Sequence, residues 1–248
     1  MEQDLSIILN SSLLERQQAI NPFRKLSEIV YETLEEAIIS FQLKPGTQLN
    51  TVKIAQLLSV SRTPIIDALE QLTETGLVVN SPNRKGYYVF DISETAIQTL
   101  IEARRAIENY AAYYCACRST EIDLKKMRIL AQQFSKAIKN WDSTNFSQID
   151  HSFHRLIIEN CGNPLLQSMN DSLDRLSIYA SHRVEDFIRI ENRSSLMMRL
   201  ENQHMSIYNA IALGLPDLAF SASNQHLETC LLLYIRGQKI VGEQEEAP

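Results

Sequence analysis

The chain has 248 residues, of which 44% are hydrophobic and 22% charged, and its formal net charge is −6. This apolar fraction excludes a disordered chain, and the 7 Gly and 7 Pro residues are too few for a collagen-like or linker protein. No apolar run approaches the roughly 20 residues that cross a membrane, and the acidic start at Glu2 and Asp4 does not indicate a secretory signal. We therefore expect a cytoplasmic protein of one large or two small domains, with no membrane partner.

The four cysteines show no spacing typical of a metal finger or a disulfide framework. They are Cys115, Cys117, Cys161 and Cys230. Reduced thiols, most of them buried, are the expectation for such a pattern in the cytoplasm.

Residues 1–20 are predicted to be an N-terminal extension, with a candidate helix over 6–20. Three helices follow, because apolar residues recur at helical spacing. Their predicted ranges are 23–41, 52–58 and a third from Ser61 to Gly76. Asn50 or Thr51 is expected to cap the second helix and Ser61 the third, with Pro64 tolerated in the first turn of the third.

Two short apolar segments, 77–80 and 87–90, flank a turn-forming run that contains Pro, Asn and Gly. This pattern predicts a β-hairpin with Arg84 and Lys85 at its tip. Helix, tight turn, helix and hairpin in this order are the layout of a winged helix-turn-helix domain, here over residues 21–92. In such a domain the last helix enters the major groove of DNA with its N-terminal residues at the base edges.

The candidate DNA-binding residues lie at the start of the third helix and on the hairpin. Arg62 can reach guanine or phosphate, and Ser61 and Thr63 can bind phosphate together with the exposed N–H groups of the helix start. Arg84 and Lys85 would contact DNA from the wing, where Gly86 permits a tight turn. Residues 21–90 carry equal numbers of basic and acidic side chains, so the alternative that these are ordinary solvated charges stays open.

A short linker, Asp91–Ser93, leads into a second half that we expect to be an all-α antiparallel bundle over residues 93–238, with Ser93 as the first cap. About six helices are predicted there. Their ranges are 94–118, 121–139, 143–160, 164–183, 192–213 and 216–236. The acidic end of the chain, residues 239–248, is expected to be a disordered tail. The predicted fold class is therefore mostly α with one small β-hairpin.

Four polar residues stand on predicted core faces of the bundle. Asp150 and His154 share one helix face at i, i+4 spacing, and His204 and His226 each lie within the apolar stripe of a different helix. Three imidazoles and one carboxylate are suitable ligands for a divalent cation such as Zn²⁺ or Ni²⁺. The alternative is three core histidines, each hydrogen-bonded to the backbone or to a neighbour.

Arg104 is a fifth inward-facing polar residue, on the stripe of the first long helix. A buried guanidinium requires an anion, and its geometry suits a carboxylate. That anion is either an internal Asp or Glu or the carboxylate of a bound ligand.

Several segments together resemble a GntR-type transcriptional regulator. They are Tyr31–Ser40, Leu43–Thr47, Val60–Leu69 with Leu72, Gly76–Val78, and the wing Pro82–Tyr87. The helical half resembles the FCD class, named for the C-terminal domain of the fatty-acid regulator. The resemblance implies a homodimer that binds a double-stranded DNA operator. It also implies metal ligation by Asp150, His154, His204 and His226, and a small organic acid bound at Arg104.

The sequence departs from the family at the DNA-reading positions. The family usually has an arginine where Ile66 stands and often another at or near Val52, beside Lys53. Ile66 lies off the apolar stripe of its helix and can contact a thymine methyl group. We therefore expect either an operator that differs from the family's guanine-rich half-site or weaker binding.

These features predict a ligand-controlled regulator and not an enzyme. A carboxylate effector would bind the metal and Arg104 and thereby alter operator affinity. One alternative is a regulator without metal whose bundle holds a larger acyl-type effector. The other is a metal-dependent hydrolase, for which the sequence offers no further general base and no use for a winged domain.

Overall fold

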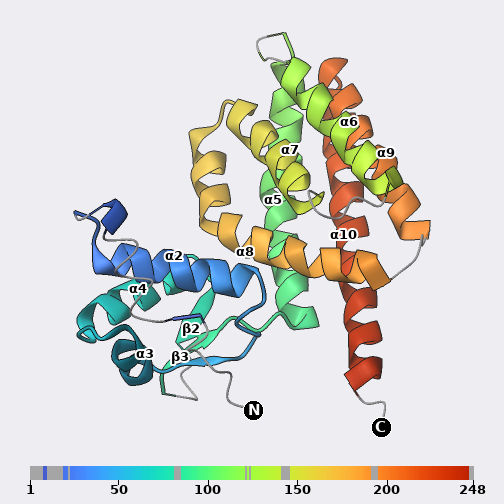
Figure 1. Cartoon of the computed structure of the whole chain (residues 1–248). Coiled ribbons are helices and arrows are strands. Elements are labelled where there is room, and N and C mark those ends of the chain that lie inside the picture. Colours follow the sequence, from blue (N-terminus) through green and yellow to red (C-terminus); the bar gives the residue numbers. More distant parts are fainter. Residues whose placement is uncertain are drawn as a thin grey trace. The chain divides into compact units, whose positions relative to one another are not determined.

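Figure 1 shows a computed structural model of the chain, which describes residues 8–9, 19–21, 23–80, 85–120, 122, 124–140, 146–190 and 195–245. The chain divides into two compact units, Met1–Ile92 with Asp174–Tyr179 and Ser93–Leu173 with Ala180–Pro248. None of the helices described is both long and apolar enough to span a bilayer. Most of the candidate helix at 6–20 lies outside the described residues.

The first unit contains three helices and a small antiparallel sheet. The helices are α2 (Leu26–Ile39), α3 (Thr51–Leu58) and α4 (Thr63–Glu74). The strands are β1 (Gln48–Leu49), β2 (Val78–Asn80) and β3 (Tyr87–Val89), in the order β1-β3-β2. The hairpin of β2 and β3 agrees with the prediction, with Val79 opposite Tyr88. The sequence did not reveal β1, which adds two residues to the other edge of β3.

Helix α4 packs through one apolar stripe onto α2, α3 and β2. The stripe residues are Ile65, Ala68, Leu69 and Leu72, each with an exposed fraction of 0%. A fully buried leucine or isoleucine contributes roughly 1.5–3 kcal/mol relative to an exposed one. The stripe therefore fixes which face of α4 is left for solvent.

The two helix starts differ in how they are capped. Asn50 caps α3 as predicted, since its side chain accepts hydrogen bonds from the backbone N–H groups of Val52 and Lys53 at 2.9 and 3.1 Å. The prediction that Ser61 caps α4 is wrong, because the helix begins at Thr63 and Arg62 holds the N-cap position without a side-chain cap. Pro64 sits in the first turn, where it has no N–H group that needs a cap.

The second unit is helical throughout its described elements, as expected. Its helices are α5 (Glu94–Cys117), α6 (Leu124–Asn140), α7 (Phe146–Asn160), α8 (Pro164–Ile190, apart from Asp174–Tyr179), α9 (Ser195–Ala212) and α10 (Pro216–Glu245). Ser93 caps α5 through a bond from the N–H of Ala96 at 3.2 Å. Two helices are longer than predicted, because α8 passes residue 183 and α10 passes residue 236 and enters the segment expected to be a disordered tail.

The bundle core forms where these helices meet. Helix α10 packs along α5 and α9, and α6 packs on α7 and α9 (Figure 1). Phe153 of α7 and Ile207 of α9 are fully buried within this core. The mostly helical fold class, with a winged helix-turn-helix unit before a helical unit, is confirmed.

Candidate metal centre and DNA interface

Four side chains from three helices meet in the core of the second unit. They are Asp150 and His154 of α7, His204 of α9 and His226 of α10, and their ligand atoms all lie within 4.8 Å of one another. The Nε2 atom of His154 is 3.2 Å from that of His204 and 3.0 Å from that of His226. Asp150 Oδ1 lies 3.2 Å from His204 Nε2. The predicted residues are thus brought together, and each is at most 6% exposed.

Glu108 of α5 links this cluster to Arg104. Its Oε1 atom accepts a hydrogen bond from Nε of Arg104 at 2.5 Å, and its Oε2 atom lies 2.8 Å from Nδ1 of His154. A hydrogen on Nδ1 of His154 leaves the lone pair of Nε2 directed at the cluster, which is the tautomer that a metal requires. The sequence did not single out Glu108, although it lies one helical turn beyond Arg104.

Two imidazoles of the cluster and its carboxylate have the protonation states that suit a metal site. Burial lowers the pKa of His204 to about 4 and places that of His226 well below its ordinary value, so both imidazoles are neutral. Burial alone would raise the pKa of Asp150, but the hydrogen bond from His204 and the nearby imidazoles hold it well below its usual range. Neutral imidazoles and an ionised carboxylate are the forms that bind a cation.

Glu108 and Arg104 form a buried ion pair behind the cluster. Burial alone would raise the pKa of Glu108, but Arg104 and His154 lower it to about 2. Burial alone would likewise lower the pKa of Arg104, and the Glu108 carboxylate raises it above its usual value. Both groups therefore remain charged at neutral pH.

Aromatic rings hold the histidines in place. The ring of Phe153 stacks on that of His204 with centroids 4.3 Å apart, and the centroids of the Phe134 and His204 rings lie 3.7 Å apart. Such walls exclude water and restrict rotation of the imidazole.

A small cavity opens beside the cluster. It is lined by Arg104, Phe146, Asp150, Ser181, Leu200, Cys230 and Tyr234. Its volume of about 10 Å³ is close to the space that one water molecule needs. The cavity adjoins both Asp150 of the cluster and Arg104. Cys230, Ser181 and Tyr234 were missed by sequence analysis because they carry no pattern beyond helical spacing.

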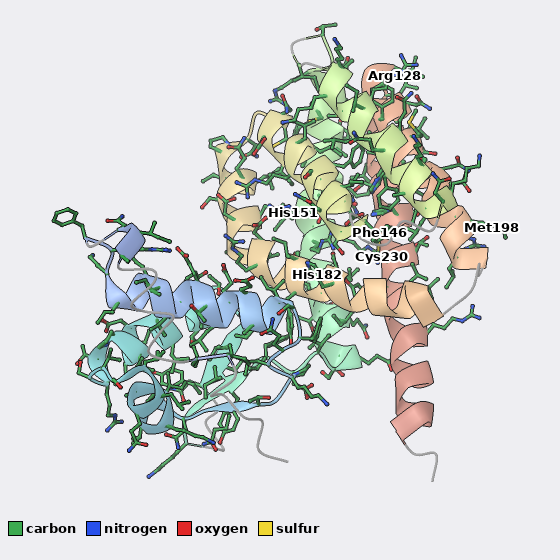
Figure 2. The ribbon with its side chains drawn as sticks, viewed as in Figure 1. Arg128, Phe146, His151, His182, Met198 and Cys230 are labelled. Atoms are coloured by element: carbon green, nitrogen blue, oxygen red, sulfur yellow. The ribbon has the colours of Figure 1, made fainter. Side chains whose placement is uncertain are left out.

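The two remaining histidines lie outside the cluster. His151 on α7 and His182 on α8 are half-buried (Figure 2).

The start of α4 presents the predicted DNA-binding side chains. Ser61, Arg62 and Thr63 are exposed, and Nη2 of Arg62 donates a hydrogen bond to Thr51 Oγ1 across 3.3 Å. This bond joins the starts of α3 and α4. Lys53 and Ile66 are half-buried.

On the wing, Lys85 is exposed and Gly86 adopts a φ of 120°, a conformation that favours glycine. Arg84, the other predicted wing residue, lies outside the described residues.

Two family models match the chain. Residues 26–89 match the bacterial regulatory proteins of the gntR family, and residues 99–229 match the FCD domain. The chain belongs to the GntR family and carries an FCD domain. The first match contains the start of α4 and the wing, and the second contains Arg104 and all four residues of the cluster.

Curated relatives of this GntR protein include a transcriptional repressor and a transcriptional activator. The HTH-type transcriptional repressor RspR of Escherichia coli (strain K12) is 26% identical over 213 residues, which cover 84% of this chain and 89% of the relative. The Glc operon transcriptional activator of the same strain is 24% identical over 228 residues, covering 83% of this chain and 87% of the relative. Both are transcriptional regulators and not enzymes, in agreement with the prediction.

Solved structures support the fold. A GntR transcriptional regulator from Rhodococcus sp. RHA1 has a TM-score of 0.64 at 22% identity and covers 84% of this chain and 97% of its own. Escherichia coli McbR/YncC has a TM-score of 0.65 at 18% identity, and the match covers 86% of this chain and 99% of the McbR/YncC chain.

Proposed function

We propose that this GntR-family regulator binds a divalent cation, Zn²⁺ or Ni²⁺, at Asp150, His154, His204 and His226, and a small carboxylate effector beside it. Effector binding alters the affinity of a homodimer for a double-stranded DNA operator. The observation that carries the proposal is the convergence of three imidazole Nε2 atoms and one carboxylate in a buried volume. Without a cation, Nε2 of His154 would face the Nε2 atoms of His204 and His226 across 3.2 and 3.0 Å, where imidazole nitrogens have few hydrogens to share.

The donor set fits the cation. Nitrogen and carboxylate ligands are those of zinc and nickel sites in helical bundles. The cation supplies a Lewis acid that attracts an anionic ligand. Glu108 orients His154, and the rings of Phe134 and Phe153 fix His204, so the chain itself positions the ligands.

Arg104 supports a carboxylate effector in particular. It lines the cavity together with Asp150, so one small anion placed there can contact both the cation and the guanidinium. Arg104 pairs with Glu108, which is one of the internal carboxylates that the sequence left open as its partner. A guanidinium has five donor hydrogens, so this pairing is compatible with binding a second carboxylate.

The size of the cavity disfavours an acyl chain. Most of its lining is apolar, but Arg104 and Asp150 stand on it, and its volume of about 10 Å³ is far too small for an acyl chain. The hydrolase alternative is set aside, because the relatives and the matched families are regulators of transcription.

For the DNA side, we propose that Arg62, Ser61 and Thr63 contact the operator from α4, with Lys53 on α3 and Ile66 further along α4. Arg84, Lys85 and Gly86 would contact it from the wing. The exposure of the α4 start supports this assignment. A homodimer would place two such surfaces on two half-sites.

Metal analysis of the purified protein tests the proposal directly. We expect about one cation per chain and a fall in melting temperature after chelation, because a ligand that binds only the folded state stabilises it. Absence of metal together with an unchanged melting temperature would contradict the proposal.

Effector binding is tested by adding small carboxylates to the metal-loaded protein and following its melting temperature. We expect a carboxylate that binds to raise the melting temperature. Arg104→Lys should abolish this increase, since lysine cannot reproduce the planar guanidinium contact. Arg105→Lys is the matched control. Arg105 is the next residue on α5, and it bonds to Asn224 and Glu228 instead of lining the cavity.

A further inference from the structure

Helix α10 offers a second side chain to the cluster, one turn after His226. The Sγ atom of Cys230 lies 3.5 Å from Nε2 of His226, and Cys230 lines the same cavity as Asp150. Figure 2 shows Cys230 on α10 near Phe146, which also lines that cavity. His226 and Cys230 thus repeat on α10 the i, i+4 arrangement that Asp150 and His154 make on α7.

The sulfur of Cys230 lies close to one of the candidate ligand atoms. Zinc lies about 2.0–2.1 Å from a histidine nitrogen and about 2.3 Å from a cysteine sulfur. Because Cys230 Sγ is 3.5 Å from Nε2 of His226, the two atoms are near enough to be shared by one ion after the Cys230 side chain rotates.

We propose that Cys230 is a fifth ligand of the cation held by Asp150, His154, His204 and His226. This inference rests on the metal site proposed above. When the cation binds, the S–H bond breaks, the proton passes to solvent and a sulfur–metal bond forms, with no change of oxidation state. The sulfur is not among the atoms that all lie within 4.8 Å of one another, so it approaches the cation by rotation of its side chain.

A thiolate ligand gives the site a definite metal preference. Sulfur favours zinc, cobalt and nickel over magnesium, calcium and manganese, which prefer oxygen ligands. The proposal therefore makes Cys230 the residue that sets metal selectivity, while the histidines and Asp150 set the position of the ion.

Cobalt(II) is a suitable probe, because a thiolate–cobalt bond absorbs in the near ultraviolet whereas nitrogen and oxygen ligands do not give that band. Metal-free full-length protein is titrated with cobalt alone. We expect the near-ultraviolet band to saturate at about one equivalent, together with the visible bands of bound cobalt.

Two variants show which cysteine supplies the sulfur that binds cobalt. Cys230→Ser should lose the near-ultraviolet band, keep the visible bands, and bind zinc at least tenfold less selectively over manganese. Cys117→Ser removes an exposed cysteine of α5 and should keep the band. If Cys230→Ser does not fold, Cys230→Ala takes its place, and the wild-type spectrum decides independently whether a thiolate is bound.

The outcomes separate the two proposals. Visible cobalt bands without a near-ultraviolet band in the wild type would overturn the role of Cys230 and leave the four-residue site intact. A band that survives in Cys230→Ser would do the same. Failure of the wild type to bind cobalt, zinc or nickel would overturn the metal site, and the role of Cys230 with it.

Discussion

His154 and Glu108 face each other across 2.8 Å, with Nδ1 of the imidazole toward Oε2 of the carboxylate. The two residues come from α7 and α5, and both are buried. The contact fixes the ring of His154 so that its other nitrogen points at the candidate metal position. It also links that ring, through Glu108, to Arg104, which lines the neighbouring cavity.

Changing Glu108 to Gln tests this link. We expect zinc affinity to fall about 10- to 100-fold, because loss of a carboxylate behind a histidine ligand weakens the site by that amount. Competition with a chromophoric chelator measures the affinity. Glu102→Gln, an exposed glutamate on the same helix, should bind zinc like the wild type. Equal affinity of the Glu108→Gln and wild-type proteins would show that the contact does not support the metal.

Changing Arg62 to Ala tests the DNA interface. We expect operator binding to weaken by about 1–3 kcal/mol if Arg62 contacts a base, with relaxed specificity at that position. Binding is measured by fluorescence anisotropy at fixed salt, since phosphate contacts make affinity depend on ionic strength. Arg128→Ala removes the same charge from the exposed face of α6 (Figure 2) and should bind normally. Undiminished binding by Arg62→Ala would mean that the reading helix is misassigned.

Ile66 and Val52 should make the operator depend on thymine methyl groups. Val52 is 44% exposed, and Ile66 lies one turn after Arg62 on the same face of α4. Replacing a contacted thymine by uracil removes one methyl, and we expect a loss of about 0.8 kcal/mol, or about fourfold in affinity. Operators substituted one position at a time would locate these contacts. If uracil is tolerated everywhere, neither side chain reads a methyl group.

Tyr31 should make the first unit sensitive to alkali. The pKa of Tyr31 is raised from 10.0 to about 12. Burial is the main cause, and the hydrogen bond that the Tyr31 hydroxyl donates to Glu35 at 2.6 Å is the second. The unfolded chain therefore loses this proton first as the pH increases, so the stabilisation is complete below pH 10 and is lost on the way to pH 12. Denaturant unfolding at several pH values should show a shallower alkaline decline in Tyr31→Phe. An identical decline in both proteins would contradict this.

The sequence predicted the elements that follow strong periodic patterns. The buried stripe of α4 was readable because Ile65, Leu69 and Leu72 recur at helical spacing. The four residues of the cluster were found for the same reason, since polar side chains at core positions need partners. Asn50 and Ser93 were recognised as caps because their side chains suit that position.

Other features depend on contacts that a linear pattern does not contain. Strand β1 has only two residues, too few to show alternation, and it exists because β3 offers a free edge. The sequence placed Arg104 inward but did not identify its anion. Glu108 lies one turn after Arg104 on α5, and the packing of α5 against α7 also brings Glu108 to His154. Helix α4 begins at Thr63, with Arg62 at the N-cap position and Pro64 in the first turn, so Ser61 lies before the helix.

The residues of the cluster are remote from one another along the chain. His154 lies 50 positions before His204 and 72 before His226. No partly folded intermediate that lacks α9 or α10 can assemble the complete set of donors, so an ion captured here would mark a bundle that has finished folding. If the proposed cation binds, newly synthesised protein would take it up only after α10 has left the ribosome.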